Sequence, residues 1–395
     1  MSHADMGLGR KLLRVVRREV GRITGRRSYL ALLTLLPAMA ILLFGLLFLH
    51  PVTSLPIALF DGDKTPTSRV LAAMVEATPG AAIRCEVQSE DEGYGRIRRG
   101  EVYALLIIPE GFERSLLGSA GAKVLFYNSG TNLTTNGVLE SAVQSAVQTL
   151  SVGTQLEMLT SQGVAPDEAM AMARPVAFDL HTLFNPGLDY AAYLAPTFMM
   201  LAMLIFAVLA TIYAIGSELK EGSAREWLAA AEGSMWCALA GKLALTTVAM
   251  IGWCGIAFFV LFALLGVPMS GSFGMLLLAT SIFVLSYQAV GVAFVALFDN
   301  MRLALSVGGG YSVLSFSFSG VTFPSIAMYA PIRLAGNLFP FTFYMRSYVD
   351  LAVRGVPIGY VLDDVAAMLL FWLLPLLLLP RLKRICEDER YWYKT

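Results

Sequence analysis

Charged residues and metal-binding side chains are scarce in this 395-residue chain. Only 15% of its residues are Asp, Glu, Lys or Arg, and 56% are hydrophobic, whereas a soluble domain carries about a quarter charged residues. The four cysteines form no CxxC pair and the three histidines are scattered, so neither a disulfide framework nor a metal site is expected. The formal net charge is zero, and this balance gives no sign of a nucleic-acid partner.

The motifs of ATP binding and of hydrolysis are also missing. No lysine completes a GxxxxGK[ST] P-loop, and neither HExxH nor GxSxG occurs. The middle of each predicted span holds no Asp, Glu, Arg or His, although a coupling ion needs such partners there. An integral-membrane enzyme and an ion-coupled transporter are therefore disfavoured. If the chain takes part in powered transport, the energy source binds to another chain.

Long apolar runs dominate what remains. A run of about 20 apolar residues is long enough to cross roughly 30 Å of hydrocarbon. The first such run, at 29–49, is longer than the core of a signal peptide, so an uncleaved transmembrane helix is favoured over a cleaved leader. Five further spans are predicted at Tyr193–Ile215, Met235–Leu265, Met275–Phe298, Leu303–Phe318 and Tyr360–Pro380. We expect a polytopic α-helical membrane protein with six transmembrane helices, five of them in a domain at 192–380.

The region before the first span is strongly basic. Eight Arg or Lys lie between Arg10 and Arg27, and apolar residues recur at helical spacing from Leu8 to Ile23. This pattern predicts a basic amphipathic helix within 1–28 that lies on an anionic membrane face, and a solvated basic tail is the alternative. The positive-inside rule places this helix and the tail at 381–395, and hence both termini, in the cytoplasm.

The segment between the first two spans has a different composition. Residues 51–190 carry 16 acidic and 9 basic residues and no apolar run of membrane length. Strands are predicted at LPIALFDGD, at the alternating stretch AAIRCEVQS and at AKVLFYNSG, and GRIRRGEVYALLIIPEGF predicts a short helix followed by a buried strand. Helical patterns occur at TSRVLAAMVEA and along a long stretch after Thr131. We expect one α/β domain at 50–191, placed outside the cytoplasm because it follows the first span.

The predicted loop at 319–359 is long and apolar. Prolines 324, 331 and 340 separate short helical runs in it. Irregular backbone at membrane depth is tolerated where protein buries it or where it lines a cavity. The segment is therefore predicted to be re-entrant or interfacial, and a lipid-exposed loop is the alternative.

A charged stretch, GSELKEGSAREWLAA, separates the second and third spans. Ser223 and Glu226 fit the S-x-x-E capping box of a helix start, and Gly222 permits a chain break before it. We predict that the second span ends here and that a short helix restarts along the membrane surface, within 217–232. A docking surface for another subunit and a solvated loop helix are the two interpretations.

At these residues the chain resembles the membrane subunit of type-2 ABC exporters. The family's cytoplasmic motif of charged residues, glycine and Ser or Thr has its counterpart in ELKEGSAREWL, although Leu219 and Arg225 depart from it. The family's asparagine–proline stretch corresponds to LFNPGLDYAAYLAP, and its serine–glycine–proline element to SGVTFP. The domain containing IALFDGD and GEVYALLIIPEGF resembles the long-ectodomain branch, which includes bacterial multidrug-type permeases.

The resemblance implies a permease of the bacterial inner membrane that pairs with a second copy or a sister permease. Cytoplasmic ATPase subunits, which would bind ATP and Mg²⁺, would dock on the short helix. The implied coupling residues are Glu218, Glu221, Gly222, Ser223, Arg225, Glu226, Trp227 and Leu228. The implied translocation path includes Gly308, Gly309, Gly310, Phe316 and Phe318, for which ordinary helix packing is the alternative.

The charge-poor path favours an amphiphilic drug or lipid-like substrate. The outer domain is predicted either to meet a periplasmic adaptor or to gate the substrate. The alternative to a permease is an ATPase-independent membrane protein of similar topology, such as a secretion or phage-receptor component.

Overall fold

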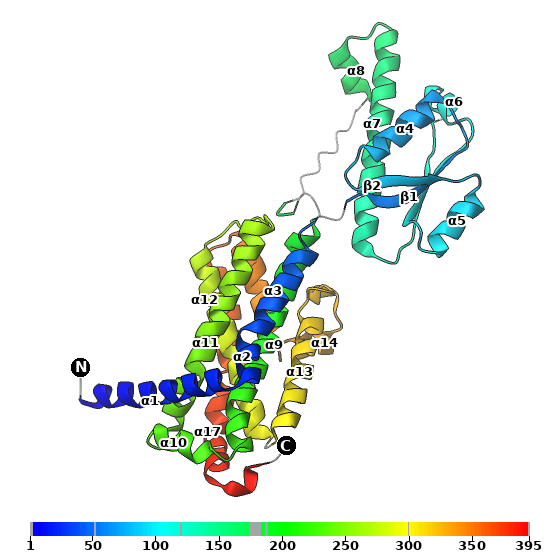
Figure 1. The fold of residues 1–395 in the computed structure, drawn as a ribbon. Coiled ribbons are helices and arrows are strands. Elements are labelled where there is room, and N and C mark those ends of the chain that lie inside the picture. The colour runs from blue at the N-terminus through cyan, green and yellow to red at the C-terminus, as the bar shows by residue number, and fades with distance from the viewer. Residues whose placement is uncertain are drawn as a thin grey trace. The chain divides into compact units, whose positions relative to one another are not determined.

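The computed structural model describes residues 3–50, 53–118, 121–173, 183–185, 189–298 and 300–393. The chain forms two compact units (Figure 1). One is His50–Tyr190, and the other combines Met1–Leu49 with Ala191–Thr395. We call them the inserted unit and the membrane unit, and we describe each by itself.

A four-stranded sheet, in the order β2–β1–β3–β4, lies at the centre of the described part of the inserted unit. β1 (Leu55–Asp61) pairs in parallel with β2 (Ala81–Glu86) and with β3 (Ala104–Ile108), whereas β4 (Leu125–Asn128) is antiparallel to β3. Every residue of β3 is buried, because this strand lies inside the sheet with helices on both faces. The four strands lie where the sequence predicted them.

Alternate residues of the strands form two small cores, as the two-residue period requires. On one face, α4 (Pro66–Glu76) and α7 (Leu133–Ser161) pack together with the short α6 (Phe112–Leu117). On the other face, α5 (Glu90–Arg98) packs alone. The helix α8 (Pro166–Ala173) packs back on α7, and neither α6 nor α8 was predicted from the sequence.

Five helical segments among the described residues are long and apolar enough to cross a membrane. The segments are Arg27–Leu47, Ala191–Lys220, Met235–Leu264, Phe273–Leu297 and Leu362–Glu387. The second lies in α9 (Tyr190–Lys220), and the fourth is α12. The other three each join two helices: α2 (Arg27–Leu33) with α3 (Leu35–Leu47), α11 (Met235–Phe259) with η1 (Val260–Leu264), and α16 (Leu362–Leu370) with α17 (Leu373–Glu387). The chain is therefore a multi-pass membrane protein. The remaining predicted span, Leu303–Phe318, lies in α13 (Met301–Phe318). Its serines and glycines make α13 less apolar than the five segments above, so six spans remain a prediction.

Short helices make up much of the segment expected to be re-entrant. They are η2 (Ser325–Ala327), α14 (Ala330–Gly336), α15 (Pro340–Tyr348), η3 (Val349–Arg354) and η4 (Ile358–Tyr360). Proline stands in the first turn of both α14 and α15, where its missing N–H costs nothing. Phe341 and Tyr344 of α15 are fully buried, whereas Tyr329 and Leu334 around α14 are exposed. Re-entry into the membrane stays a prediction.

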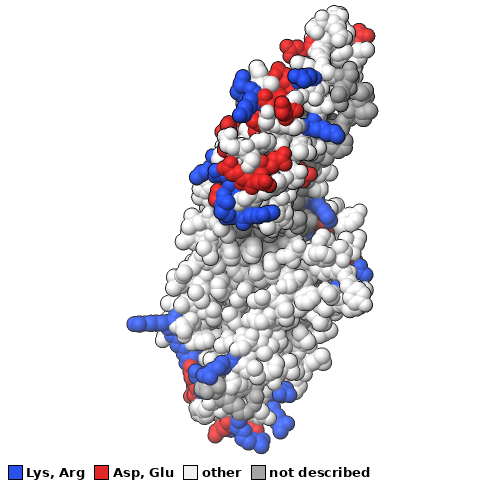
Figure 2. Space-filling model, turned by 90° about the vertical axis from the view of Figure 1, so that its right-hand side faces the viewer, with Lys and Arg blue, Asp and Glu red and all other residues white. Residues whose placement is uncertain are grey.

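α1 (His3–Gly25) lies across the end of the membrane unit where α10 (Ala224–Ala230) and η5 (Glu389–Tyr391) are found (Figure 1). Charged atoms of this unit gather at the same end, and most of the visible face beyond it carries none (Figure 2). The helix α1 was predicted from the sequence, but the face that it buries is not the row of apolar residues from Leu8 to Ile23. Val15 and Glu19 are buried, whereas Leu8 and Val20 are largely exposed.

Candidate functional site

In the charged stretch GSELKEGSAREWLAA the helix is interrupted at Gly222, as the sequence predicted. α9 ends at Lys220, Gly222 adopts φ +70°, and α10 starts at Ala224. A side chain at Gly222 would be strained at this φ, and its Cβ would lie only 2.2 Å from the Tyr393 hydroxyl. The turn between α9 and α10 therefore requires glycine for its conformation, and a larger residue there would also displace the exposed Tyr393 side chain.

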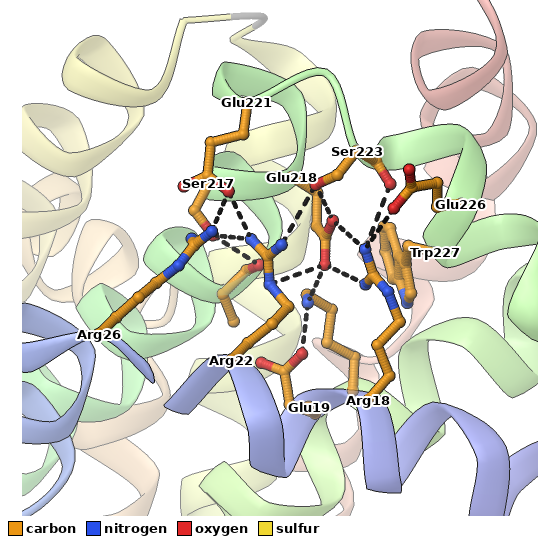
Figure 3. A network of polar contacts seen from close by, with 12 residues as sticks. Arg18, Glu19, Arg22, Arg26, Ser217, Glu218, Glu221, Ser223, Glu226 and Trp227 are labelled. Atoms are coloured by element: carbon orange, nitrogen blue, oxygen red, sulfur yellow. Dashed lines mark hydrogen bonds and ion pairs between the residues drawn. The ribbon is translucent and has the colours of Figure 1, made fainter. Parts of the chain in front are cut away.

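Glu218, in the last turn of α9, is the centre of an ionic network (Figure 3). Its side chain is fully buried. Arg18 of α1 binds both carboxylate oxygens, at 2.5 and 2.9 Å. The Arg22 guanidinium lies 3.1 Å from one of them, and the Lys242 ammonium donates to the same oxygen at 2.7 Å. One carboxylate thus joins three cations from two other helices.

Lys242 of α11 also binds a second buried carboxylate. Its ammonium donates to Glu19 of α1 at 2.6 Å, and the Tyr29 hydroxyl donates to the other Glu19 oxygen at 2.8 Å. The side chains of Lys242 and Glu19 are 0% and 1% exposed. Lys242 also lies 5.2 Å from the ring centroid of Trp227, a favourable cation–π distance. This shared cation ties α1, α9, α10 and α11 together.

A more exposed layer surrounds this core. Arg22 donates to the Ser217 hydroxyl at 3.0 Å and to Glu221 at 3.3 Å, and Arg26 also pairs with Glu221. Burial on its own would lower the pKa of Arg18, but the hydrogen-bonded carboxylate of Glu218 outweighs it and the pKa is raised. Arg18 therefore carries its charge at every physiological pH.

The predicted capping box is wrong. The Ser223 side chain caps no amide of α10. Its hydroxyl donates instead to Glu218 and accepts from Arg22 at 3.2 Å, while the Glu226 carboxylate lies 3.8 Å from Arg18. The local signature fails because charged groups from a distant helix compete for the same serine.

Comparison with known proteins identifies the family. The sequence profile of the ABC-2 family transporter proteins matches residues 27–379, which is most of the chain. The chain belongs to the ABC-2 family of transporter proteins. None of the curated proteins compared with the chain matches it.

The family assignment confirms the resemblance to type-2 ABC permeases. An ABC-2 permease is the membrane component of a transporter and is typically not the catalytic one, and its family implies an ATPase partner in general. The match begins after α1, so the network joins the family region to a helix that precedes it.

The predicted coupling residues of this ABC-2 permease fall into a buried group and an exposed group, and Gly222 and Ser223 are half-buried between them. Glu218, Trp227 and Leu228 are buried, and the Trp227 indole donates to the Ala238 carbonyl at 3.1 Å. Glu221, Arg225 and Glu226 are exposed, together with Ala229. Arg225 is held from the C-terminal side, because it donates to Glu389 at 2.6 Å and to the Glu387 carbonyl, and it lies over the Trp392 ring. Only the exposed group can contact a partner directly, and that role stays a prediction.

The predicted path residues of this ABC-2 permease lie along α13. A Cβ at Gly308 would lie 2.6 Å from Ile212 of α9, so this glycine permits close helix packing. Gly309 and Gly310 have no atom within 4 Å of such a Cβ. Phe316 and Phe318 lie near other aromatic rings, those of Phe198 and Phe339 respectively, each at 5.5 Å. Their part in transport stays a prediction.

Seven members of the network were not predicted as site residues: Arg18, Glu19, Arg22, Arg26, Tyr29, Ser217 and Lys242. About 200 residues separate Arg18 from Glu218 along the chain, so no local pattern links them. Two signals were nevertheless present, namely the single carboxylate among the basic residues of α1 and the single lysine in the apolar run of α11.

Proposed function

We propose that this ABC-2 permease is a subunit of an ATP-driven exporter and that α10 is the helix on which a separate ATPase subunit docks. That subunit would bind ATP and Mg²⁺, since this chain has no P-loop. The basic residues of α1 favour a cytoplasmic location for this end, in the inner membrane of a bacterium. The contact surface is the exposed face of α10, with Arg225 and Glu226, together with Glu221 in the turn just before it.

The observation that carries the proposal is the rigid attachment of α10. Trp227 and Leu228 are buried beneath it, and Glu218 just before it is bound to α1 and α11. A displacement applied to α10 would therefore move the ends of α9 and α11 together with α1, because the buried charges cannot separate without a large cost. This is what a coupling helix needs in order to transmit ATPase closure to the membrane helices.

The rest of the proposal concerns assembly and cargo. A second copy, or a sister permease, would pack on α13, where Leu303, Val313 and Leu314 are exposed. The scarcity of charge in the spans favours export of an amphiphilic drug or lipid-like molecule. The inserted unit would lie outside the cytoplasm and either bind a periplasmic adaptor or gate the substrate. Family membership favours this function over an ATPase-independent membrane protein.

Charge reversal at Glu226 tests the docking role. Its side chain is 79% exposed, so Glu226→Arg should leave the permease folded. We expect the variant to lose the ATPase that copurifies with the wild-type permease, and to lose permease-dependent ATP hydrolysis. Loss of one interface charge pair should weaken binding at least about tenfold.

The matched control is Glu76→Arg, which reverses an exposed charge on α4 of the inserted unit. It should retain the ATPase. If Glu226→Arg binds the ATPase as tightly as this control does, α10 is not the docking helix. If no ATPase copurifies even with the wild type, the ATPase-independent alternative gains support.

A further inference from the structure

A groove of about 510 Å³ lies on the membrane unit between α11, α12 and α17. All three helices belong to segments long enough to span a membrane, so the groove lies in the membrane-spanning part of the unit. Its lining is almost entirely apolar and includes Ala240 and Val248. Two tryptophans also line it, Trp236 and Trp372, whose side chains are 58% and 37% exposed.

One strongly polar side chain, Gln288, lines the same groove. Gln288 is 2% exposed, and its amide oxygen accepts from the Thr247 hydroxyl at 2.7 Å. Its amide nitrogen is buried and has no hydrogen-bond partner among the described residues. If the amide is turned over, its nitrogen pairs with Thr247 and its oxygen is left alone. In either orientation one polar atom stays unsatisfied, which is costly in an apolar site and typical of a functional one.

The size of the groove limits what can fill it. A transmembrane helix is about 10 Å wide and about 30 Å long, several times the volume available here. Small-molecule sites typically measure about 300–1,000 Å³. A single small molecule therefore fits the groove, whereas a helix of a second copy does not.

The depth of Gln288 restricts the ligand further. Gln288 stands nine residues before the end of α12 at Leu297, which is about 14 Å along the helix axis. A lipid headgroup stays at the membrane surface, so it would not reach this amide. The matching polar group must lie on the apolar body of the ligand. No charged side chain lines the groove, and the ligand should therefore be neutral.

We propose that the groove binds a neutral, lipid-soluble molecule of small-drug size that carries an amide or hydroxyl group. Such a group both donates and accepts, so it satisfies the free atom of Gln288 in either orientation once a small rotation of this buried side chain turns that atom toward the groove. The tryptophan rings provide flat apolar walls for the remainder of the molecule. The proposal goes beyond the function proposed above, because binding here requires neither an ATPase nor transport.

The test uses two photoreactive probes of equal length, a diazirine-bearing fatty primary amide and a diazirine-bearing alkane. The full permease is reconstituted in lipid nanodiscs without ATPase, and labelled peptides are mapped by mass spectrometry. We expect the amide probe to label residues 236–248 and 285–292. Gln288→Leu should lower this labelling about fivefold or more, the effect of one lost hydrogen bond, and should leave the alkane labelling unchanged.

Two further variants separate recognition from folding. Ser281→Ala also removes a polar group of α12, but among the described residues its hydroxyl bonds to nothing except the Leu277 carbonyl of its own helix, so labelling should not change. Ala240→Phe fills the groove and should abolish labelling by both probes. The proposal is overturned if the wild type is not labelled at the groove, as when another protein copy covers it. It is equally overturned if Ala240→Phe leaves the labelling unchanged, or if Gln288→Leu lowers labelling by the amide probe and by the alkane probe to the same extent.

Discussion

Lys242 places one ammonium between two buried carboxylates, Glu19 and Glu218. Burying ions costs several kcal/mol each, and the pairing roughly offsets that cost. The network therefore adds little net stability, but it fixes the orientation of the helices, because each buried charge must stay next to its partners. Its physical role is to fix α1, α9 and α11 in one arrangement, and removing one member should be expensive.

Lys242→Met tests that expectation. The substitution leaves Glu19 with only the Tyr29 hydroxyl, and it removes one cation from Glu218. We expect a loss of about 3–5 kcal/mol, the usual cost of an unpaired buried charge. The readout is the apparent melting temperature of the purified permease in detergent.

Glu226→Gln is the control for Lys242→Met, because it alters an exposed carboxylate of the same site. It should melt like the wild type. The double variant Glu19→Gln/Lys242→Met should recover part of the loss, since no unpaired carboxylate is then left buried at position 19. An unchanged melting temperature for Lys242→Met would mean that the network does not hold these helices together.

In the inserted unit, Asp63 carries out a helix-capping role from outside the helix. Its carboxylate accepts from the amides of Gly111, Phe112 and Glu113, at 2.7, 3.1 and 3.0 Å. Partial burial acts to raise the pKa of Asp63, but these amides and the Thr65 hydroxyl outweigh it, and the pKa is lowered. The ionised carboxylate thus stabilises the start of α6.

Asp63→Asn should loosen this start. At neutral pH we expect a loss of about 1 kcal/mol, typical of a lost cap, and about fivefold faster hydrogen exchange of amides 111–113. A lowered pKa gives stability that is present above the unfolded value of about 4 and is lost as the pH falls through the folded value. Wild type and variant should therefore differ at pH 7 and converge once the pH falls below the folded pKa of Asp63, when measured by exchange mass spectrometry. If the exchange rates of wild type and variant still differ in acid, the charge of Asp63 is not what stabilises the start of α6.

At the scale of elements, local sequence patterns correctly predicted the strands, helices and chain breaks that depend on neighbouring residues alone. The strands of the inserted unit, the helix after Thr131 and the break at Gly222 follow from periodicity and backbone freedom, and all are present. The capping box failed because Ser223 bonds to groups of α1 and α9. The network itself could not be predicted, since nothing in a single sequence shows that Arg18 and Glu218 meet. Partners distant in sequence are determined by packing.

The packing of α1 on α11 depends on one glycine. A Cβ at Gly241 would lie 2.8 Å from Val15, closer than real atoms approach. Gly241→Leu should therefore force α1 away from α11 and separate Lys242 from Glu19. We expect faster tryptic cleavage at the many basic residues of α1, by about tenfold if the displacement costs about 1.4 kcal/mol.

Gly252→Leu is the control for this prediction. Gly252 also lies in α11, but no atom stands within 4 Å of a Cβ placed there. Cleavage of this variant should match the wild type. Equal cleavage of the two variants would show that α1 is not held by close contact at Gly241.

At the scale of the whole molecule, α13 is one of several membrane-unit helices that the described residues leave partly uncovered. α13 packs its Ala304 and Gly308 side inward, and Leu303, Val313 and Leu314 are exposed on it. Some exposed apolar side chains are expected where lipid covers a span. Small residues on the exposed side are a different signal, since they allow the backbone of a neighbouring helix to approach closely.

Gly310→Leu tests whether a second permease packs there. No atom lies within 4 Å of a Cβ at this position, so the single subunit accommodates a side chain, whereas a closely packed partner helix does not. We expect Gly310→Leu to shift the permease from dimer to monomer, with a dissociation constant raised at least about tenfold, as measured by light scattering in detergent across a concentration series. Gly252→Leu, an equally open glycine on α11, should leave the dimer intact. If both variants stay dimeric with the same dissociation constant, α13 faces lipid, and the second copy must pack on another helix.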